Sequence, residues 1–247
     1  MRFGLRSKLG ALLMGSITSV ATEQPVAALT FDDGPDPIWT PHLLEVLEKY
    51  QAKATFFMVG VCAQEHFDLV RRVTAGGHAI GNHSWSHESF PLLTRQERLK
   101  QLCSCARVLG SYGGQMFRPP FGHQDFRSRF DLWTAGYRVI TWSVVEPDWL
   151  DRDAETLASG ILRRLRPGAI ILLHDRLFDY LNPAYRNREP TVKAVELVLR
   201  ELSGRYKFVT VPDLLRRGHP RRDWWIRPAE ISVLNALQRQ EAAVHAE

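Results

Sequence analysis

Two adjacent aspartates, Asp32 and Asp33, follow a short apolar run at residues 26–31 and precede Gly34-Pro35. Asp-Asp-Gly-Pro is favourable turn sequence, so a plain turn is the simplest interpretation. Two adjacent carboxylates repel each other, however, and consecutive side chains diverge. One of them can therefore ligate a cation while its neighbour acts as a base on a nearby water.

Two histidines, His83 and His87, lie four residues apart. This spacing brings two imidazoles together on a helical face or in a tight turn. Two neutral nitrogens and one carboxylate make a three-ligand site with open positions, which is typical of catalytic Zn²⁺ and similar divalent ions. The pair alone is a weak signal, because two surface or core histidines have the same pattern. No Glu follows the first His, so the motif is not that of the HExxH metalloproteases.

Further ionisable groups follow other strand-like segments. Arg118 begins Arg-Pro-Pro-Phe-Gly, Asp148 precedes Trp149, and His174 precedes Asp175. In parallel α/β architectures the carboxyl ends of the strands carry the active site. We therefore expect these groups to meet at one edge of a sheet.

The hydrophobic pattern alternates between strand-like and helix-like segments from residue 26 onward. The expected strands are 26–31, 54–59, 78–83, 116–119, 137–143, 169–174 and 207–211, and the expected helices are 41–50, 67–75, 95–109, 127–135, 154–165 and 191–202. Several strands are apolar throughout, which indicates a parallel sheet covered by helices. A closed barrel and an open, doubly wound sheet both fit this pattern.

The two ends of the chain differ from the rest, and we divide it into residues 1–21, a domain over 22–217 and an arm over 218–247. The first segment has basic residues, a short apolar stretch and a small-residue site, which is the outline of a signal peptide. Gly and Ser interrupt the apolar stretch, and residues 16–22 also fit an edge strand, so we favour a cytoplasmic location over export. An amphipathic stretch at 229–240 predicts a helix in the arm. No apolar run reaches about 18 residues, so no transmembrane segment is expected.

The composition is that of an ordinary soluble domain. Of 247 residues, 45% are hydrophobic and 24% charged, with a net charge of +5. The two densest basic stretches fit helix ends, where cations complement the helix dipole, so no nucleic-acid partner is expected. Cys62, Cys103 and Cys105 form neither an even set nor a CxxC pair, which favours reduced thiols.

Five motifs together resemble the signatures of the polysaccharide deacetylases, carbohydrate esterase family 4, with the NodB-homology fold. They lie in the same order as in that family, at residues 30–35, 83–87, 118–122, 148–149 and 172–174. The resemblance covers residues 22–217. It implies an α/β fold, a distorted (β/α) barrel of about seven parallel strands, which agrees with the seven strands expected above.

The resemblance also implies roles for individual residues. Asp33, His83 and His87 would hold a divalent metal, with Zn²⁺ preferred and Co²⁺, Mn²⁺ or Ni²⁺ as alternatives. Asp32 would be the general base, oriented by Arg118.

The remaining implied roles concern the leaving group and the acetyl pocket. His174 would be the general acid, supported by Asp148. The backbone N–H of Phe121 would stabilise the oxyanion, and Trp149 and Leu172 would shape the acetyl pocket.

The chain departs from the family pattern at two places. Phe121 replaces the usual Tyr, and the acid that usually stands upstream of the Asp-Trp pair is displaced to Glu146 or missing. We expect altered substrate contacts rather than lost chemistry. Specificity is expected in loops 88–94, 123–126 and 178–190. Six further histidines, of which His123 is the one expected near substrate, have no obvious partners: His42, His66, His78, His123, His219 and His245.

The sequence therefore predicts a metal-dependent deacetylase acting on an N-acetylhexosamine in a polysaccharide, an oligosaccharide or a glycolipid precursor. An O-acetyl esterase acting on an acetylated polysaccharide such as acetylxylan is the alternative. A silent glycan-binding protein is a third hypothesis, but its usual mark, the loss of the base or of a metal ligand, is not seen. An acetylated glycan is the expected partner, and the sugar and the oligomeric state stay open.

Overall fold

The central sheet of the computed structural model has eight strands, seven of which lie side by side in a single path. The structure describes residues 14–244. In spatial order the strands of the path are β6 (Arg138–Val139), β5 (Gly113–Phe117), β4 (Ala79–Asn82), β3 (Ala54–Met58), β2 (Val26–Asp32), β8 (Ile170–His174) and β7 (Val144–Val145). The eighth strand, β9 (Lys207–Phe208), also pairs with β2. Every pairing in this sheet is parallel, as predicted.

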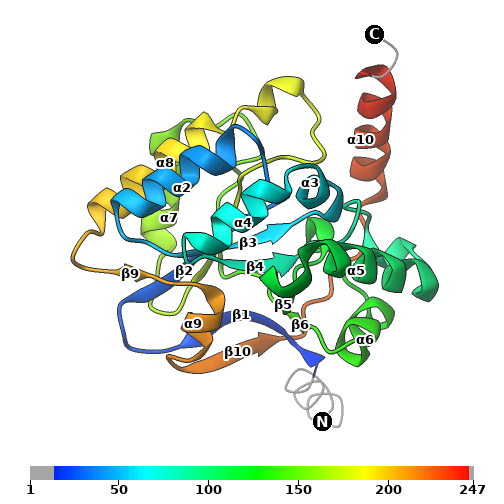
Figure 1. Ribbon diagram of the computed structural model, residues 1–247, viewed down its shortest axis with the longest axis horizontal. Helices are drawn as coiled ribbons and strands as arrows, with labels where there is room; N and C mark the ends of the chain where they lie inside the picture. The colour runs from blue at the N-terminus through cyan, green and yellow to red at the C-terminus, as the bar shows by residue number, and fades with distance from the viewer. Residues whose placement is uncertain (1–13, 245–247) are drawn as a thin grey trace.

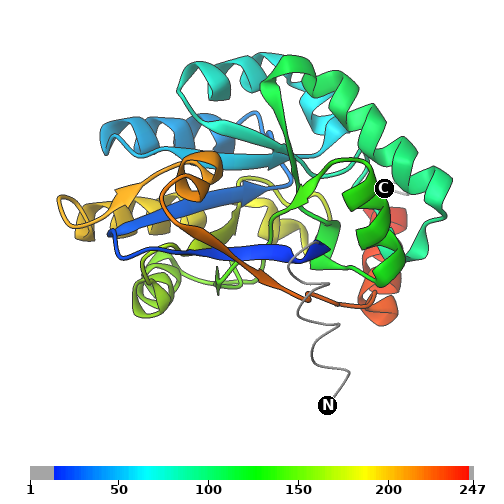
Figure 2. The same cartoon turned by 90° about the horizontal axis from the view of Figure 1, so that it is seen from below.

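The sheet curls, and a strand from the N-terminal segment lies across the gap between its two ends. This strand, β1 (Ser16–Ala21), bridges to Ile140 next to β6 and to Ala169 next to β8. It pairs antiparallel with β10 (His219–Asp223), and the two form a ribbon along the lower side of the molecule (Figure 2). The result is the distorted half-barrel implied by the family resemblance, and not an open doubly wound sheet.

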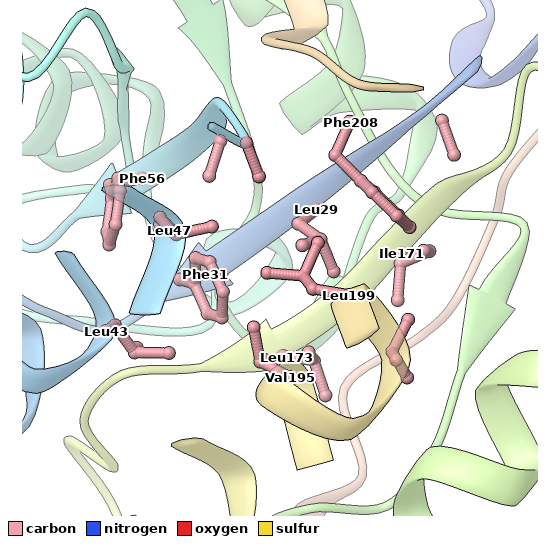
Figure 3. Close-up of a cluster of buried hydrophobic side chains, with 14 of the residues drawn as sticks. Leu29, Phe31, Leu43, Leu47, Phe56, Ile171, Leu173, Val195, Leu199 and Phe208 are labelled. Carbon is pink, nitrogen blue, oxygen red and sulfur yellow. The ribbon is translucent and has the colours of Figure 1, made fainter. Parts of the chain in front are cut away.

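Helices cover the outer face of the sheet (Figure 1). They are α2 (Trp39–Lys49), α3 (Gly60–Glu65), α4 (Phe67–Ala75), α5 (Arg95–Leu109), α7 (Ala154–Arg164) and α8 (Glu189–Glu201). Alternate residues of the strands face them: Leu29 and Phe31 of β2 and Leu173 of β8 pack with Val195 and Leu199 of α8 (Figure 3). This buried cluster fixes the strands against the helices.

The other residues of each strand face the inside of the half-barrel, because successive side chains of a strand point to opposite faces. Ala28, Phe57 and Ile170 form an inner cluster with residues of β1 and of the short helix α9 (Val211–Leu215). The same alternation directs the last inward side chains of β2 and β8, Asp32 and His174, toward the carboxyl-end opening.

Two expectations from the sequence need correction. Of the predicted strand 137–143 only β6, residues 138–139, is a strand, because the chain then crosses to the other end of the sheet and forms β7 at residues 144–145. The C-terminal arm, predicted to be helical, begins with β10 and only then forms α10 (Ile231–Val244). The sequence of β10, His-Pro-Arg-Arg-Asp, has no apolar alternation, because its partner β1 supplies the buried side chains Ile17 and Val20.

The structure describes only part of the N-terminal segment. Residues 16–21 form a strand, whereas the signal-like residues 1–13 lie outside the described residues. The domain boundaries at 21/22 and 217/218 stay a prediction. The three cysteines are free thiols. Within residues 14–244, no helix combines the length and the apolar character that crossing a bilayer requires.

Candidate active site

Asp32 and His174 are neighbours in the sheet. In the parallel pairing of β2 with β8, Asp32 lies opposite His174 and Thr30 lies opposite Leu172. All four residues occupy inward positions at the carboxyl ends of their strands. Strand register alone therefore places the predicted base beside the predicted acid.

Backbone strain concentrates in the loops that follow the strands. Of the five non-glycine residues with positive φ among the described residues, four lie here: Asp33 (74°), Ser84 (70°), His87 (57°) and Phe121 (57°). Such angles are uncommon for residues with a Cβ and cluster at functional sites. At Asp33 the left-handed conformation ends the strand alternation, so its carboxylate diverges from that of Asp32.

The side chains of Asp33, His83 and His87 converge on a common point. Oδ1 of Asp33 lies 3.2 Å from Nε2 of His83 and 3.2 Å from Nε2 of His87. One ligand atom from each residue lies within 4.8 Å of the others, and all three residues are buried. Oδ1 of Asp33 is buried and makes no hydrogen bond of good geometry within residues 14–244. An oxygen and two nitrogens in this arrangement fit a divalent metal with open coordination positions.

Both histidines are oriented through their other ring nitrogen. Nδ1 of His83 lies 2.7 Å from the carbonyl oxygen of Arg118, and Nδ1 of His87 lies 2.5 Å from Oδ2 of Asp179. An Nδ1–H that donates to these oxygens leaves the Nε2 lone pair directed at the cluster, as in metal sites with supporting carboxylates. Asp179 is absent from the predicted site residues. It lies in loop 178–190, where the sequence predicts substrate specificity but not a partner for His87.

The charges in the cluster support each other. Burial alone would raise the pKa of Asp33, but the charge of His87 and the close approach of the Nε2 atoms of His83 and His87 hold it well below its usual value. Burial likewise acts to lower the pKa of His87, but the carboxylates of Asp33 and Asp179 outweigh it and raise that pKa to about 10. The cluster therefore keeps Asp33 ionised and attracts positive charge.

A fully buried arginine holds Asp32. Nη1 of Arg118 donates to Oδ1 of Asp32 at 2.7 Å and to the hydroxyl of Thr30 at 2.7 Å. Its other nitrogens donate to the carbonyl oxygens of Ile140 and Thr141, and its guanidinium lies 4.2 Å from the ring centroid of Phe57. A guanidinium fixed at this many points leaves Asp32 little freedom, with Oδ2 3.7 Å from Nε2 of His83.

His174 is held by Asp148 in a comparable way. Nδ1 of His174 lies 2.8 Å from Oδ1 of Asp148. The other carboxylate oxygen of Asp148, Oδ2, accepts a hydrogen bond from the backbone N–H of His174 at 2.9 Å. Behind it, Thr191 donates to Oδ2 at 3.2 Å and Arg188 donates to the Asp148 carbonyl at 2.6 Å. Burial acts to lower the pKa of His174, but the Asp148 carboxylate raises it above its usual value. Arg188 and Thr191 belong to no motif, and sequence reasoning missed them.

These groups open onto a cavity of about 340 Å³. Asp32, Asp33, His83, His87 and His174 line it, together with the predicted substrate residues Phe121, Trp149 and Leu172. The ring centroids of Phe121 and His87 are 4.5 Å apart, and those of Trp149 and His174 are 5.6 Å apart. Arg118 and Asp148 are not cavity-lining residues, so they support Asp32 and His174 from behind.

Asp175 also follows a strand, but it supports the turn rather than the cavity. Its carboxylate accepts a hydrogen bond from Thr40, and a Cβ placed on Gly34 would lie 2.2 Å from its Oδ2. Burial raises the pKa of Asp175 to about 7. The glycine of Asp-Asp-Gly-Pro is thus required for this close approach.

Of His123 and Glu146, the two residues that the sequence suggested near the site, only His123 lines the cavity. His123 lines the cavity, as expected, and its Nδ1 lies 3.0 Å from the hydroxyl of Ser89. Burial and the positive charge of Arg227 lower its pKa to about 4, so it is neutral. Glu146 is paired instead with Arg164 of α7 and does not line the cavity. The displaced acid of the fourth motif therefore does not reach the site.

Known proteins resemble this chain over most of its length. The family model for polysaccharide deacetylase matches residues 19–140. A peptidoglycan-N-acetylglucosamine deacetylase of Bacillus cereus is 34% identical over 81% of this chain and 92% of its own length. The chain therefore belongs to the polysaccharide deacetylases, carbohydrate esterase family 4, and is a hydrolase of that family.

Solved structures share the fold. That of a peptidoglycan N-acetylglucosamine deacetylase has a TM-score of 0.74 and 29% identity, and the match covers 83% of this chain and 94% of that one. That of a family 4 acetyl xylan esterase from Clostridium thermocellum, in complex with a cobalt ion, has a TM-score of 0.68 and 32% identity, covering 77% of this chain and 90% of that one.

Proposed function

We propose that the protein hydrolyses the N-acetyl group of an N-acetylhexosamine with the help of a divalent metal held by Asp33, His83 and His87. The observation that carries the proposal is the buried Oδ1 of Asp33, which makes no hydrogen bond of good geometry with any described residue and lies 3.2 Å from two imidazole nitrogens. A bound metal would polarise the acetyl carbonyl and make water more acidic.

Asp32 is the general base in this proposal. Its carboxylate, held by Arg118 at 2.7 Å, takes a proton from the water that attacks the acetyl carbon. The arginine keeps the carboxylate in one orientation and balances its charge. A base fixed in this way loses little entropy when the substrate binds.

Phe121 and its neighbours stabilise and enclose the acetyl group. Its backbone N–H donates to the oxyanion that develops on the acetyl oxygen. The left-handed conformation at Phe121 sets the direction of this N–H. Trp149 and Leu172 surround the acetyl methyl group. Because the role of residue 121 is a backbone one, Phe can replace the usual Tyr without loss of this step.

His174 is the general acid. Its Nε2 gives a proton to the sugar nitrogen as the C–N bond breaks, so that acetate and a free amine leave. Asp148 holds Nδ1 and favours the imidazolium form that this step requires. The water oxygen ends in acetate, and the proton taken by Asp32 returns to solvent.

Names of relatives support an amide substrate. The Bacillus cereus protein is named a peptidoglycan-N-acetylglucosamine deacetylase. An O-acetyl ester is the second candidate, because the acetyl xylan esterase is 32% identical and the same groups would cleave the weaker ester bond. Zn²⁺ is the proposed metal, with Co²⁺, Mn²⁺ and Ni²⁺ as alternatives, since supply and geometry decide between them as much as affinity.

The test is acetate release with controlled metal loading. Purified protein should release acetate from an N-acetylglucosamine oligomer, lose this activity after chelation and regain it when Zn²⁺ or Co²⁺ is added. Acetylated xylan assayed in parallel separates the amide from the ester. Failure to bind any divalent metal under all loading conditions would refute the proposal.

A further inference from the structure

The walls of the cavity differ from its floor. The floor is made by the buried catalytic groups, whereas five aliphatic side chains line the walls: Leu150, Leu177, Leu181, Val233 and Leu237. We call these five residues the apolar wall. They come from three separate parts of the chain, which are the loop after β7, the loop after β8 and helix α10.

The outer members of the apolar wall are exposed. Leu150 is 41% exposed, Leu181 49% and Val233 39%. Covering aliphatic side chains at the mouth of a cavity with an apolar ligand removes them from water and favours binding. A wall of this kind has no donor or acceptor to offer to a sugar hydroxyl.

Three polar side chains of the cavity outside the catalytic set, Arg227, His123 and Asp179, have protein partners, and Tyr180 and Tyr185 also line it. Arg227 donates to Glu230 at 3.0 Å, and His123 is hydrogen-bonded to Ser89. Asp179 accepts from His87. The hydroxyls of a second or third sugar would have to find their partners among the tyrosine hydroxyls and the remaining N–H groups of Arg227, whereas an alkyl chain needs no partner.

Helix α10 forms one side of this mouth. Val233 and Leu237 lie four residues apart, so they share one face of the helix, and that face lines the cavity. In Figure 1, α10 stands upright beside the body of the molecule. It belongs to the C-terminal arm and lies beyond the residues that the family model matches.

We propose that the substrate is an N-acetylhexosamine attached to an aliphatic aglycone, as in a glycolipid, and that the apolar wall binds the aglycone. This inference rests on the proposed function. The sugar lies over the catalytic floor with its acetyl group between Trp149 and Leu172, and the alkyl chain leaves along Leu150, Leu181 and Val233. A cavity of about 340 Å³ suits one sugar and several methylene groups, since small-molecule sites span about 300–1,000 Å³.

The test compares glycosides that differ only in the aglycone. Octyl and methyl β-glycosides of N-acetylglucosamine, both below micelle-forming concentration, and the N-acetylglucosamine tetramer are assayed for acetate release by the metal-loaded protein. Because each buried methylene contributes about 0.8 kcal/mol, we expect kcat/KM for the octyl glycoside to exceed that for the methyl glycoside by at least about 10-fold. The tetramer should be no better than the methyl glycoside.

Serine variants locate the effect on the apolar wall. Leu181→Ser and Val233→Ser replace exposed side chains, so they should fold normally. Each should lower kcat/KM for the octyl glycoside by about 5-fold and change that for the methyl glycoside by less than about 2-fold. Ile38→Ser is the matched control, because Ile38 is 57% exposed and does not line the cavity.

The outcomes separate this inference from the proposed function. Equal turnover of octyl and methyl glycosides, or a preference for the tetramer, overturns the aglycone site and leaves the deacetylase intact. If no compound releases acetate, the proposed function fails, and binding of the two glycosides measured by isothermal titration calorimetry decides whether the apolar wall binds the aglycone. Tighter binding of the octyl glycoside that Leu181→Ser weakens then supports the apolar wall, and equal binding overturns it.

Discussion

Strand β4 has a histidine before its amino end and two histidines after its carboxyl end. The pKa of the histidine before the strand and the pKa of His87 after it are shifted in opposite directions. His78 precedes the strand, and its pKa is lowered to about 4. His87 follows it, and its pKa is raised to about 10. Both side chains are buried, so burial is not what distinguishes them.

The neighbours make the difference. Burial acts to lower the pKa of both histidines. At His78 the ammonium group of Lys53 lowers it further, and Nδ1 accepts a hydrogen bond from the backbone N–H of Ala54. At His87 the carboxylates of Asp33 and Asp179 outweigh the burial. The amino end of the strand therefore has a neutral structural histidine, and its carboxyl end has the charged groups of the candidate active site.

Asp32→Asn should have the largest effect at the carboxyl end. Asparagine keeps the shape and the contact with Arg118 but cannot take a proton from water. We expect kcat to fall by about 10³-fold, with bound metal unchanged because Asp33, His83 and His87 remain. Acetate release and metal content by mass spectrometry measure the two effects.

The control for Asp32→Asn is Asp68→Asn, which neutralises a surface carboxylate whose side chain is 88% exposed. Its activity should equal that of the wild type. Loss of metal together with loss of activity in Asp32→Asn would place Asp32 among the ligands and contradict its role as the base.

Asp148→Asn tests the acid side of the same sheet end. The Asp148 carboxylate raises the pKa of His174 against the effect of burial, and the general acid must be protonated. Activity is therefore lost as pH rises through the pKa of His174. Removing the negative charge of Asp148 lowers that pKa. We expect the basic limb of the kcat profile to move to lower pH, with kcat at the optimum reduced by about 10- to 100-fold. An unmoved basic limb would show that His174 is not the group whose protonation limits the rate.

Sequence reasoning predicted the parts of this site that lie in strands and motifs. Apolar strands that alternate with helices predicted the parallel sheet, and the register of the strands then places Asp32 beside His174. Asp179, Arg188 and Thr191 were missed because they act through single contacts from loops and helix starts, where no spacing reveals the partner. Strand β10 was missed for a related reason, since its partner β1 is about 200 residues away in the chain and β10 has no alternation of its own.

Asp179→Asn should weaken the metal site rather than the chemistry. An amide oxygen at this position still accepts from Nδ1 of His87, but it lacks the charge that strengthens the ligand. Metal affinity should fall by about 10-fold or more, and kcat at saturating metal should change by less than about 3-fold. Titration with Zn²⁺ or Co²⁺ measures the affinity, with Asp151→Asn, an exposed change in another loop, as control. Unchanged affinity would mean that the 2.5 Å contact is structural only.

His78→Asn is the smallest change and tests the other end of β4. The folded-state pKa of His78, about 4, lies below its ordinary value of 6.5, so the unfolded chain binds a proton in this window while the folded protein does not. Stability from the neutral imidazole is thus present above pH 6.5 and is lost as pH falls toward 4.

Asparagine keeps an acceptor for the Ala54 N–H and does not titrate. Between pH 7 and pH 5 the wild type should lose about 1–2 kcal/mol of unfolding free energy more than the variant, measured by urea unfolding. All other titrating groups are common to both proteins and cancel in the comparison. Equal losses would mean that His78 is protonated in the folded state, and that the two ends of the strand do not differ in the way their neighbours imply.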